Sequence, residues 1–260
     1  PLLAENEMAN ESRQAVLAKL ASNPRYTALF AETFDEGLTE RTLGRALAAY
    51  QRALLSGDSP FDRWYFGDER STGRSSGAED YPALAARGFA VFQDKGCASC
   101  HRFNDKSALF TDGQYHNTGT GYQRAGRALR PPSVQLAPGV FVVPTVDAET
   151  ETFTDDGRFE VTGREADKWR YRTPSLRNVA LTSPYMHDGS IATLEGVIAF
   201  YKEGGGGDPT QDPRTRSVQL TESDQTALVA FLRTLTSSHV NALVSDARSV
   251  TIGERTAGNH

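Results

Sequence analysis

Apolar residues recur at steps of three and four over five stretches of the chain, which is the spacing of amphipathic helices. These stretches are residues 11–21, 39–55, 82–93, 192–202 and 222–235. Polar residues suited to N-caps stand where three of the helices would begin: Thr39, Thr193, and either Thr221 or Ser223. The pattern therefore predicts a mainly α-helical fold.

The segments between these helices are polar and rich in turn-forming residues. Residues 67–80 are rich in Gly and Ser and read as a linker or surface loop. Residues 102–172 contain Gly, Pro, Asn and Asp throughout, which predicts a long irregular stretch with a short strand near Val140–Val143. We expect four parts: a helical segment over 1–66, the linker over 67–80, a domain over 81–236, and a polar, irregular tail over 237–260.

Composition narrows the range of partners. The net charge of −5 gives no reason to expect nucleic acid as a partner. No apolar run approaches the roughly 20 residues that span a bilayer, so we expect no membrane span.

The sequence Cys97-Ala98-Ser99-Cys100-His101 carries the clearest chemistry, and it holds the only two cysteines among 260 residues. A C-x-x-C-H run indicates covalent haem c: each thiol adds to one vinyl group of the porphyrin, and the His binds the iron. The alternatives are a redox C-x-x-C that precedes a His, or half of a zinc site. No second Cys pair exists to complete a zinc tetrahedron. Because haem is attached outside the cytoplasm, the motif also predicts a periplasmic protein.

The order of elements around the motif resembles a class I cytochrome c domain. A helix leads into C-x-x-C-H, a long irregular stretch wraps the haem, and an amphipathic helix ends the domain. In such domains the first and last helices cross with a small residue against an aromatic one. Gly88-Phe89 and Phe231 are placed to make that crossing.

Four further motifs resemble those of the bacterial di-haem cytochrome c peroxidases and MauG-type enzymes. They are Phe61-Asp62-Arg63 after a Ser-Gly-Asp-Ser-Pro turn, His116-Asn117-Thr118-Gly119, the Arg-Thr-Pro-Ser-Leu-Arg-Asn run at 172–178, and the Pro-Tyr-Met-His-Asp-Gly run at 184–189. The resemblance covers about residues 1–236.

The family has two cytochrome-like domains, each with one C-x-x-C-H, and this chain matches the second. The resemblance implies that residues 1–66 lead out of a first haem domain that is missing here, on another chain or on a segment before Pro1. The chain starts without an initiator Met or a signal sequence, so we expect residue 1 not to be the start of the gene product. In the family a Glu near this point lies beside the peroxidatic haem. Glu7 is the match, and the alternative is a residue that caps or solvates the first helix.

The second axial ligand of the haem decides between the family's two chemistries. Family peroxidases have a Met at the position fourteen residues after His187, whereas MauG-type enzymes have a Tyr. This chain has Tyr201 there. The resemblance implies that Tyr201 binds iron opposite His101, and the alternative is a Tyr that packs on the haem edge. An anionic oxygen ligand should lower the reduction potential of the haem.

The resemblance also assigns roles to residues of the 182–188 stretch. His187 is expected beside the haem without binding iron, with ligation as the alternative. Met186 is the other candidate ligand if the haem proves to be His/Met. The main-chain carbonyls of Thr182 and Pro184 match the family's calcium site between the haems, and hard oxygen ligands suit Ca²⁺.

Together these features predict a MauG-like di-haem oxidoreductase. It would use peroxide-derived high-valent haem to oxidise a residue of a partner protein by long-range electron transfer. One alternative is a di-haem cytochrome c peroxidase that reduces hydrogen peroxide with electrons from a small donor protein. Another is a non-catalytic c-type electron-transfer subunit, which the single C-x-x-C-H favours.

Overall fold

The computed structural model describes residues 2–3, 8–54, 56–67, 80–125, 134–137, 140–142, 155–216 and 218–249. The chain divides into two compact units, one of residues 1–55 with 240–260 and the other of residues 56–239. Among the described residues, no helix combines the length and the apolar character needed to cross a membrane.

The first unit is helical, with the bounds α1 Arg13–Ala21, α2 Pro24–Thr33, α3 Glu40–Ala53 and α10 Val240–Ser249. The helices predicted over 11–21 and 39–55 are confirmed, and Thr39 caps α3 with a hydrogen bond from the Thr42 amide. Helix α2 was not predicted, although it begins with Pro after an Asn cap, which is a favourable start. The prediction of an irregular tail is wrong, because residues 240–249 form α10.

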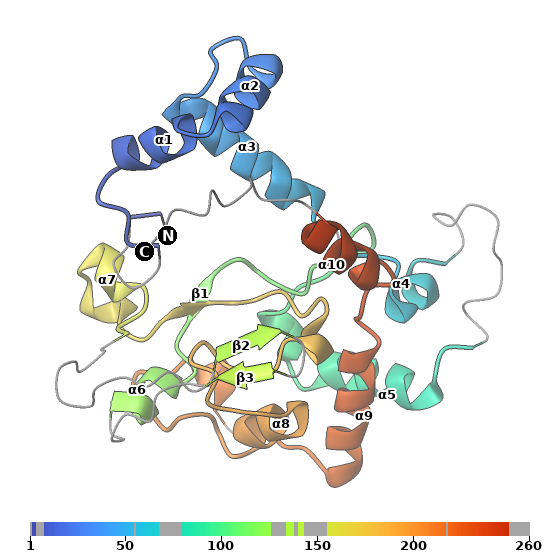
Figure 1. Ribbon diagram of the computed structural model, residues 1–260. Helices are drawn as coiled ribbons and strands as arrows, with labels where there is room; N and C mark the ends of the chain where they lie inside the picture. Colours follow the sequence, from blue (N-terminus) through green and yellow to red (C-terminus); the bar gives the residue numbers. More distant parts are fainter. Residues whose placement is uncertain are drawn as a thin grey trace. The chain divides into compact units, whose positions relative to one another are not determined.

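The second unit carries the remaining elements, drawn in Figure 1. Its helices are α4 Pro60–Tyr65, α5 Ala83–Asp94, α6 Thr120–Ala125, α7 Phe159–Thr162, α8 Leu194–Lys202 and α9 Glu222–Arg233. Its 3-10 turns are η2 Cys97–Ser99, η3 Glu165–Asp167, η4 Val179–Leu181 and η5 Pro213–Thr215. Its strands are β1 Tyr115–His116, β2 Val134–Ala137, β3 Val140–Val142 and β4 Tyr171–Arg172.

The strands form two small antiparallel pairs. β1 pairs with β4, placing Tyr115 opposite Arg172 and His116 opposite Tyr171. β2 pairs with β3, which confirms a strand near Val140. The described residues between 102 and 172 contain no helix longer than six residues, so the long irregular stretch is confirmed there. The mainly α-helical class is confirmed as well.

Helices α5 and α9 cross in close contact, and they lie side by side in Figure 1. Gly88 makes the close approach possible, because a Cβ at this position would lie 1.9 Å from the Ala227 carbonyl oxygen and 2.8 Å from the Phe231 Cβ. This is the predicted crossing of Gly88-Phe89 with Phe231. It fixes the end of α5, and therefore the start of the C-x-x-C-H segment, against the last helix of the unit.

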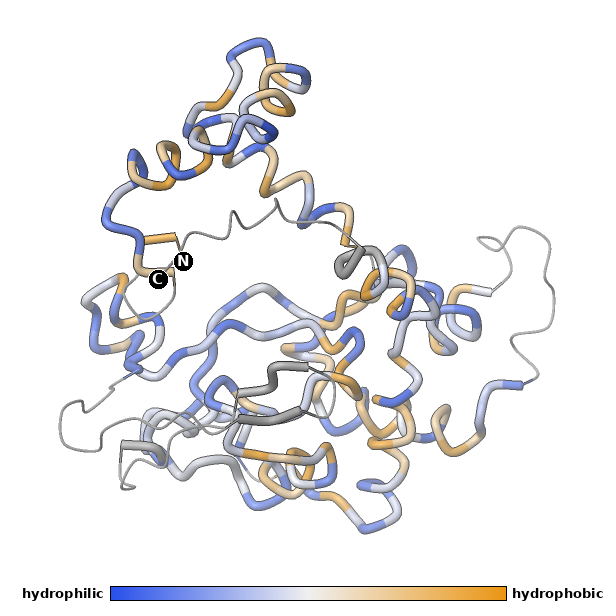
Figure 2. The backbone as a smooth tube through the Cα atoms, in the orientation of Figure 1, coloured by the Kyte–Doolittle hydropathy of each residue, from blue (hydrophilic) through white to orange (hydrophobic). Residues whose placement is uncertain are grey.

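An aromatic core surrounds the crossing. Phe61, Phe110 and Phe231 are 0% exposed, and Phe89 and Phe92 are almost fully buried. The Phe61 ring meets Phe89, Phe110 and Phe231 edge to face at centroid distances of 5.1 to 5.6 Å, an arrangement that aromatic pairs favour. Figure 2 shows hydrophobic segments gathering along α5, α8 and α9. Through Phe61, α4 belongs to the same core as the C-x-x-C-H segment.

Candidate haem site

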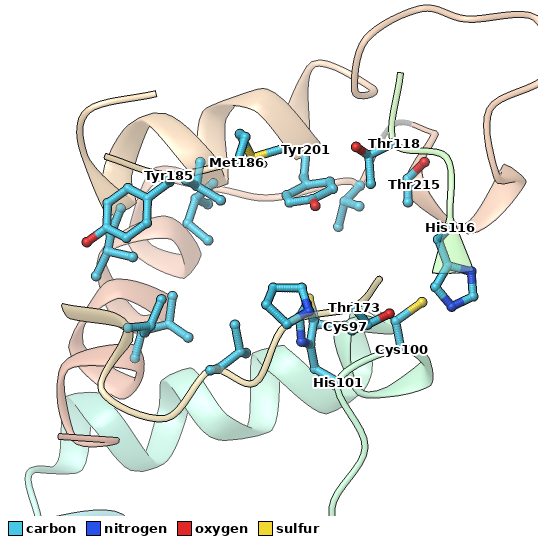
Figure 3. A pocket seen from close by; sticks show the side chains of 18 of the residues that line it. Cys97, Cys100, His101, His116, Thr118, Thr173, Tyr185, Met186, Tyr201 and Thr215 are labelled. Carbon is cyan, nitrogen blue, oxygen red and sulfur yellow. The ribbon is translucent and has the colours of Figure 1, made fainter. Parts of the chain in front are cut away.

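A cavity of about 420 Å³ lies against the C-x-x-C-H segment. This volume falls within the roughly 300–1,000 Å³ of small-molecule and cofactor sites. Its walls come from η2, from the 171–187 stretch, from α8 and from α9; Leu194, Ile198, Leu228 and Leu232 supply much of the apolar lining. Figure 3 shows the cavity with its lining side chains.

Cys97, Cys100 and His101 all line this cavity. Gly96 has a positive φ of 79°, and this left-handed turn ends α5 and starts the 3-10 turn η2. The turn presents the two thiols to the cavity and leaves His101 directly after them. The two cysteines are not joined in a disulfide, and burial raises the pKa of the Cys97 thiol to about 11.

The His101 ring is oriented by a backbone carbonyl. Its Nδ1 lies 2.9 Å from the carbonyl oxygen of Phe110. A carbonyl only accepts, so Nδ1 carries the hydrogen and the lone pair is left on Nε2. Burial lowers the pKa of His101, which favours the neutral imidazole that binds metals.

The residues present fit haem c. Two thiols spaced C-x-x-C and an imidazole with its Nε2 lone pair available line one largely apolar cavity. Haem ligands usually have the second ring nitrogen held by a partner such as a carbonyl, as His101 does. The structure thus brings together the three residues predicted to hold the haem.

Tyr201 and Met186 lie on the wall across the cavity from His101 (Figure 3). Tyr201 belongs to α8, whose start is fixed by Thr193, which accepts a hydrogen bond from the Gly196 amide. Burial raises the pKa of the Tyr201 phenol, so the phenol is neutral unless a positive charge stands near it. Met186 comes from the preceding loop and has a positive φ of 68°. Both candidate axial ligands predicted from the sequence therefore face the same cavity.

His187 lines the cavity but is tied to neighbouring side chains. Its ring stacks on Tyr171 at a centroid distance of 3.5 Å. Its Nδ1 lies 3.3 Å from the Thr120 hydroxyl, and its Nε2 lies 3.6 Å from an Asp155 carboxylate oxygen. Contacts at both ring nitrogens agree better with a supporting residue than with an iron ligand.

A polar cluster at one end of the cavity was not predicted in full. His116 binds Asp112 through Nε2 at 2.8 Å and Asp212 through Nδ1 at 3.0 Å, and Arg214 binds Asp212 at 2.6 Å. The hydrogen bond from Arg214 holds the pKa of Asp212 well below its usual range. His116 and Asp212 are far apart in the sequence, so the sequence did not predict that they meet.

The same cluster bears on the zinc alternative. Among the described residues, only Cys100, Asp112 and His116 form a group of potential metal ligands, and Cys97 is not part of it. Both nitrogens of His116 already have carboxylate partners. The arrangement gives no support to a zinc site that uses both cysteines.

Thr182 and Pro184 also line the cavity. Thr182 donates its hydroxyl to the Val179 carbonyl at 3.2 Å. Their role as calcium ligands stays a prediction. Glu7 lies outside the described residues.

The helix before C-x-x-C-H, its crossing with the last helix of the unit, and a cavity lined by the motif define a cytochrome c-like domain. A family profile described as di-haem cytochrome c peroxidase matches residues 1–70. Over most of its length the chain is similar to di-haem cytochrome c peroxidases and MauG proteins.

Relatives of both kinds match most of the chain. Methylamine utilization protein MauG of Methylorubrum extorquens is 35% identical over 90% of this chain and 56% of its own length. Cytochrome-c peroxidase IdrP1 of Denitromonas iodatirespirans is 34% identical over 90% of this chain and 61% of its own length. The chain therefore spans somewhat more than half the length of these relatives, and names of both kinds occur at similar identity.

Solved structures agree with this placement. A MauG-like protein associated with microbial copper homeostasis is 28% identical, with a TM-score of 0.60 over 88% of this chain and 64% of its own. The diheme peroxidase BthA of Burkholderia thailandensis is 25% identical, with a TM-score of 0.61 over 92% of this chain and 62% of its own. The predicted cytochrome c-like fold is thereby confirmed.

Proposed function

We propose that this chain is the second haem domain of a periplasmic, MauG-like di-haem oxidoreductase that oxidises a residue of a partner protein. The observation that carries the proposal is the position of Tyr201 across the cavity from His101. Haem c bound to Cys97 and Cys100 supplies one-electron redox chemistry at its iron. His101 would hold the iron through Nε2, and Tyr201 would offer an oxygen donor from the opposite wall.

The protein surroundings of Tyr201 favour this role over that of a simple electron relay. An anionic oxygen ligand stabilises the higher charge on iron and lowers the reduction potential. The apolar walls from α8 and α9 exclude water and so strengthen the attraction between phenolate and metal charge. A low-potential haem suits the storage of oxidising equivalents rather than electron delivery to a peroxide-reducing centre.

A first haem domain is part of the proposal, either on a segment before Pro1 or on a companion chain. Support comes from the relatives, which are much longer than this chain, and from the surface of α3. Leu47 and Tyr50 on that helix, and Leu54 directly after it, are 42 to 57% exposed. Such a stripe of exposed apolar residues is typical of a helix that packs against further protein. Glu7 would stand beside the peroxidatic haem of that domain, and Ca²⁺ would bind near Thr182 and Pro184.

Peroxide titration of the full-length holoprotein tests this function. The resting ferric protein should take up one equivalent of hydrogen peroxide without prior reduction and then return two oxidising equivalents to an added donor. A protein that reacts with peroxide only after the haem of this chain is reduced would be a plain cytochrome c peroxidase.

The peroxidase remains a second candidate because Met186 lies on the same wall as Tyr201. A thioether ligand would give this haem a high potential and make it an electron-delivery site for a small donor protein. The axial ligand therefore decides between the two functions, and its identity is accessible to spectroscopy.

A further inference from the structure

The Phe110 carbonyl, which accepts the hydrogen bond from His101 Nδ1, belongs to a residue with an uncommon backbone conformation. Phe110 is 0% exposed and has a positive φ of 53°, a conformation that non-glycine residues rarely adopt. The Phe110 oxygen lies 2.9 Å from His101 Nδ1. Such a conformation persists only where its surroundings hold it.

Three side-chain hydrogen bonds fasten the 108–111 segment to the 173–177 segment. Ser175 Oγ donates to the Leu109 carbonyl at 2.6 Å, and Thr111 Oγ1 donates to the Thr173 carbonyl at 2.7 Å. Arg177 Nε donates to the Ala108 carbonyl at 2.6 Å. Phe110 thus lies between anchored neighbours on both sides.

Arg177 is itself fixed by a carboxylate on α4. Its two terminal nitrogens donate to the two oxygens of Asp62 at 2.6 and 2.7 Å, and the two side chains are only 9% and 14% exposed. Asp62 also accepts from the Ser59 amide in the capping box of α4. The guanidinium carbon lies 5.5 Å from the centre of the Phe110 ring. A two-point pair of this kind sets direction as well as attraction.

We infer that Arg177, oriented by Asp62, is a positioning residue for the proximal ligand His101: it holds the Phe110 carbonyl on the Nδ1 hydrogen and so helps to set the reduction potential of the haem. The inference rests on the haem binding at Cys97, Cys100 and His101 proposed above. It does not depend on whether the protein acts as a MauG-like oxidase or as a peroxidase.

The expected sign follows from the chemistry of imidazole. A strong hydrogen bond from Nδ1 makes the imidazole a more electron-rich ligand, which favours Fe(III) and lowers the reduction potential. Loosening the carbonyl should therefore raise the potential. Arg177→Lys isolates this effect, because Lys keeps the positive charge but lacks the planar fork and the Nε donor.

The test uses the full-length holoprotein with three variants. Arg177→Lys should favour reduction by about tenfold, which is about 59 mV for one electron. Ser175→Ala should shift the potential in the same direction by less. Arg233→Lys is the matched control, because Arg233 forms an exposed pair with Glu195 at 3.1 Å, where both side chains are more than half exposed. It should leave the potential unchanged.

The second measurement is the hyperfine-shifted NMR signal of the His101 Nδ1 hydrogen. In Arg177→Lys and Ser175→Ala it should move and exchange faster with solvent, while the Arg233→Lys signal should match wild type. Unchanged potential and unchanged signal in both variants would overturn the inference. If Arg177→Lys does not fold, Ser175→Ala alone decides. Absence of covalent haem in the wild type would refute the proposed function as well, and is visible before any variant is compared.

Discussion

Tyr201 and Met186, which lie on one wall of the cavity, are both candidates for the second axial ligand of the haem iron. They differ sharply as ligands: a phenolate is a charged oxygen donor, and a thioether is a neutral sulfur donor. Their positions follow from different local structure, since Tyr201 lies on α8 and Met186 on a loop with positive φ. The haem spectrum separates them directly.

Tyr201→Phe removes the phenol oxygen while keeping the ring. If Tyr201 binds iron, the variant should open a coordination position, so that spin state and binding of exogenous ligands change. Tyr201→Met should raise the potential of this haem, because a neutral sulfur replaces an anionic oxygen. Optical and near-infrared spectra with redox titration provide the measurement. Identical wild-type and Tyr201→Phe spectra would show that Tyr201 only packs, and a His/Met band in the wild type would assign Met186 instead.

The thiols and the imidazole of C-x-x-C-H have separable roles. The double variant Cys97→Ala, Cys100→Ala should release its haem into acid–acetone, because no thioether bond remains. His101→Ala should retain haem through that extraction but lose its proximal ligand. Haem that extracts freely from the wild type would contradict covalent attachment.

At the scale of elements, the crossing of α5 and α9 depends on Gly88, because glycine has no side chain to hold the helices apart. Gly88→Ala would place a methyl 1.9 Å from the Ala227 carbonyl. Because that neighbour is backbone, the helices must separate, and overpacking of this kind costs about 1–3 kcal/mol or more. Thermal or denaturant unfolding measures the loss.

Gly44→Ala is the matched control for that substitution. Gly44 also lies inside a helix, α3, but a Cβ there meets nothing within 4 Å. It should stabilise the protein by up to about 1 kcal/mol through helix propensity. Equal effects of the two substitutions would argue against the close crossing.

The helix starts predicted best from the sequence are those with both an apolar stripe and a capping residue. Helices α3, α8 and α9 have both, and each begins within two residues of its expected start. Helix α4 was missed because six residues are too few for periodicity to show, whereas α10 was missed although Val240, Leu243 and Val244 recur at helical spacing. The Asp62–Arg177 pair joins two distant motifs and is fixed by tertiary packing. The sequences of these two motifs indicated a resemblance to a known family, but they did not predict that the motifs contact each other.

At the scale of the whole molecule, the number of haems separates the proposals. This chain has one C-x-x-C-H. The native protein should contain one further haem c, on a preceding segment or on a companion chain. Intact mass together with a haem assay measures this number. A mature assembly with one haem per copy would favour the electron-transfer subunit and contradict the di-haem assignment.

The expected calcium site lies between two haems, so a test of calcium also concerns the whole molecule. Removing Ca²⁺ should disturb electron exchange between them, since carbonyl ligands at Thr182 and Pro184 would lose their shared ion. Activity and haem spectra before and after chelation, with metal analysis, provide the measurement. Full retention of both after proven removal would argue against a functional ion.

The crossing of α5 with α9 also affects the order in which the parts of the haem site form. Cys97 and Cys100 lie far before residues 222–233 in the chain, so α9 reaches the site only through a long-range contact made during folding. Leu228 and Leu232 form part of the cavity wall, so that wall is absent while the thiols first become available. Contacts between such distant segments also form slowly. Late arrival of α9 leaves an interval in which a haem can be delivered to an open site, and docking of the helix then encloses it.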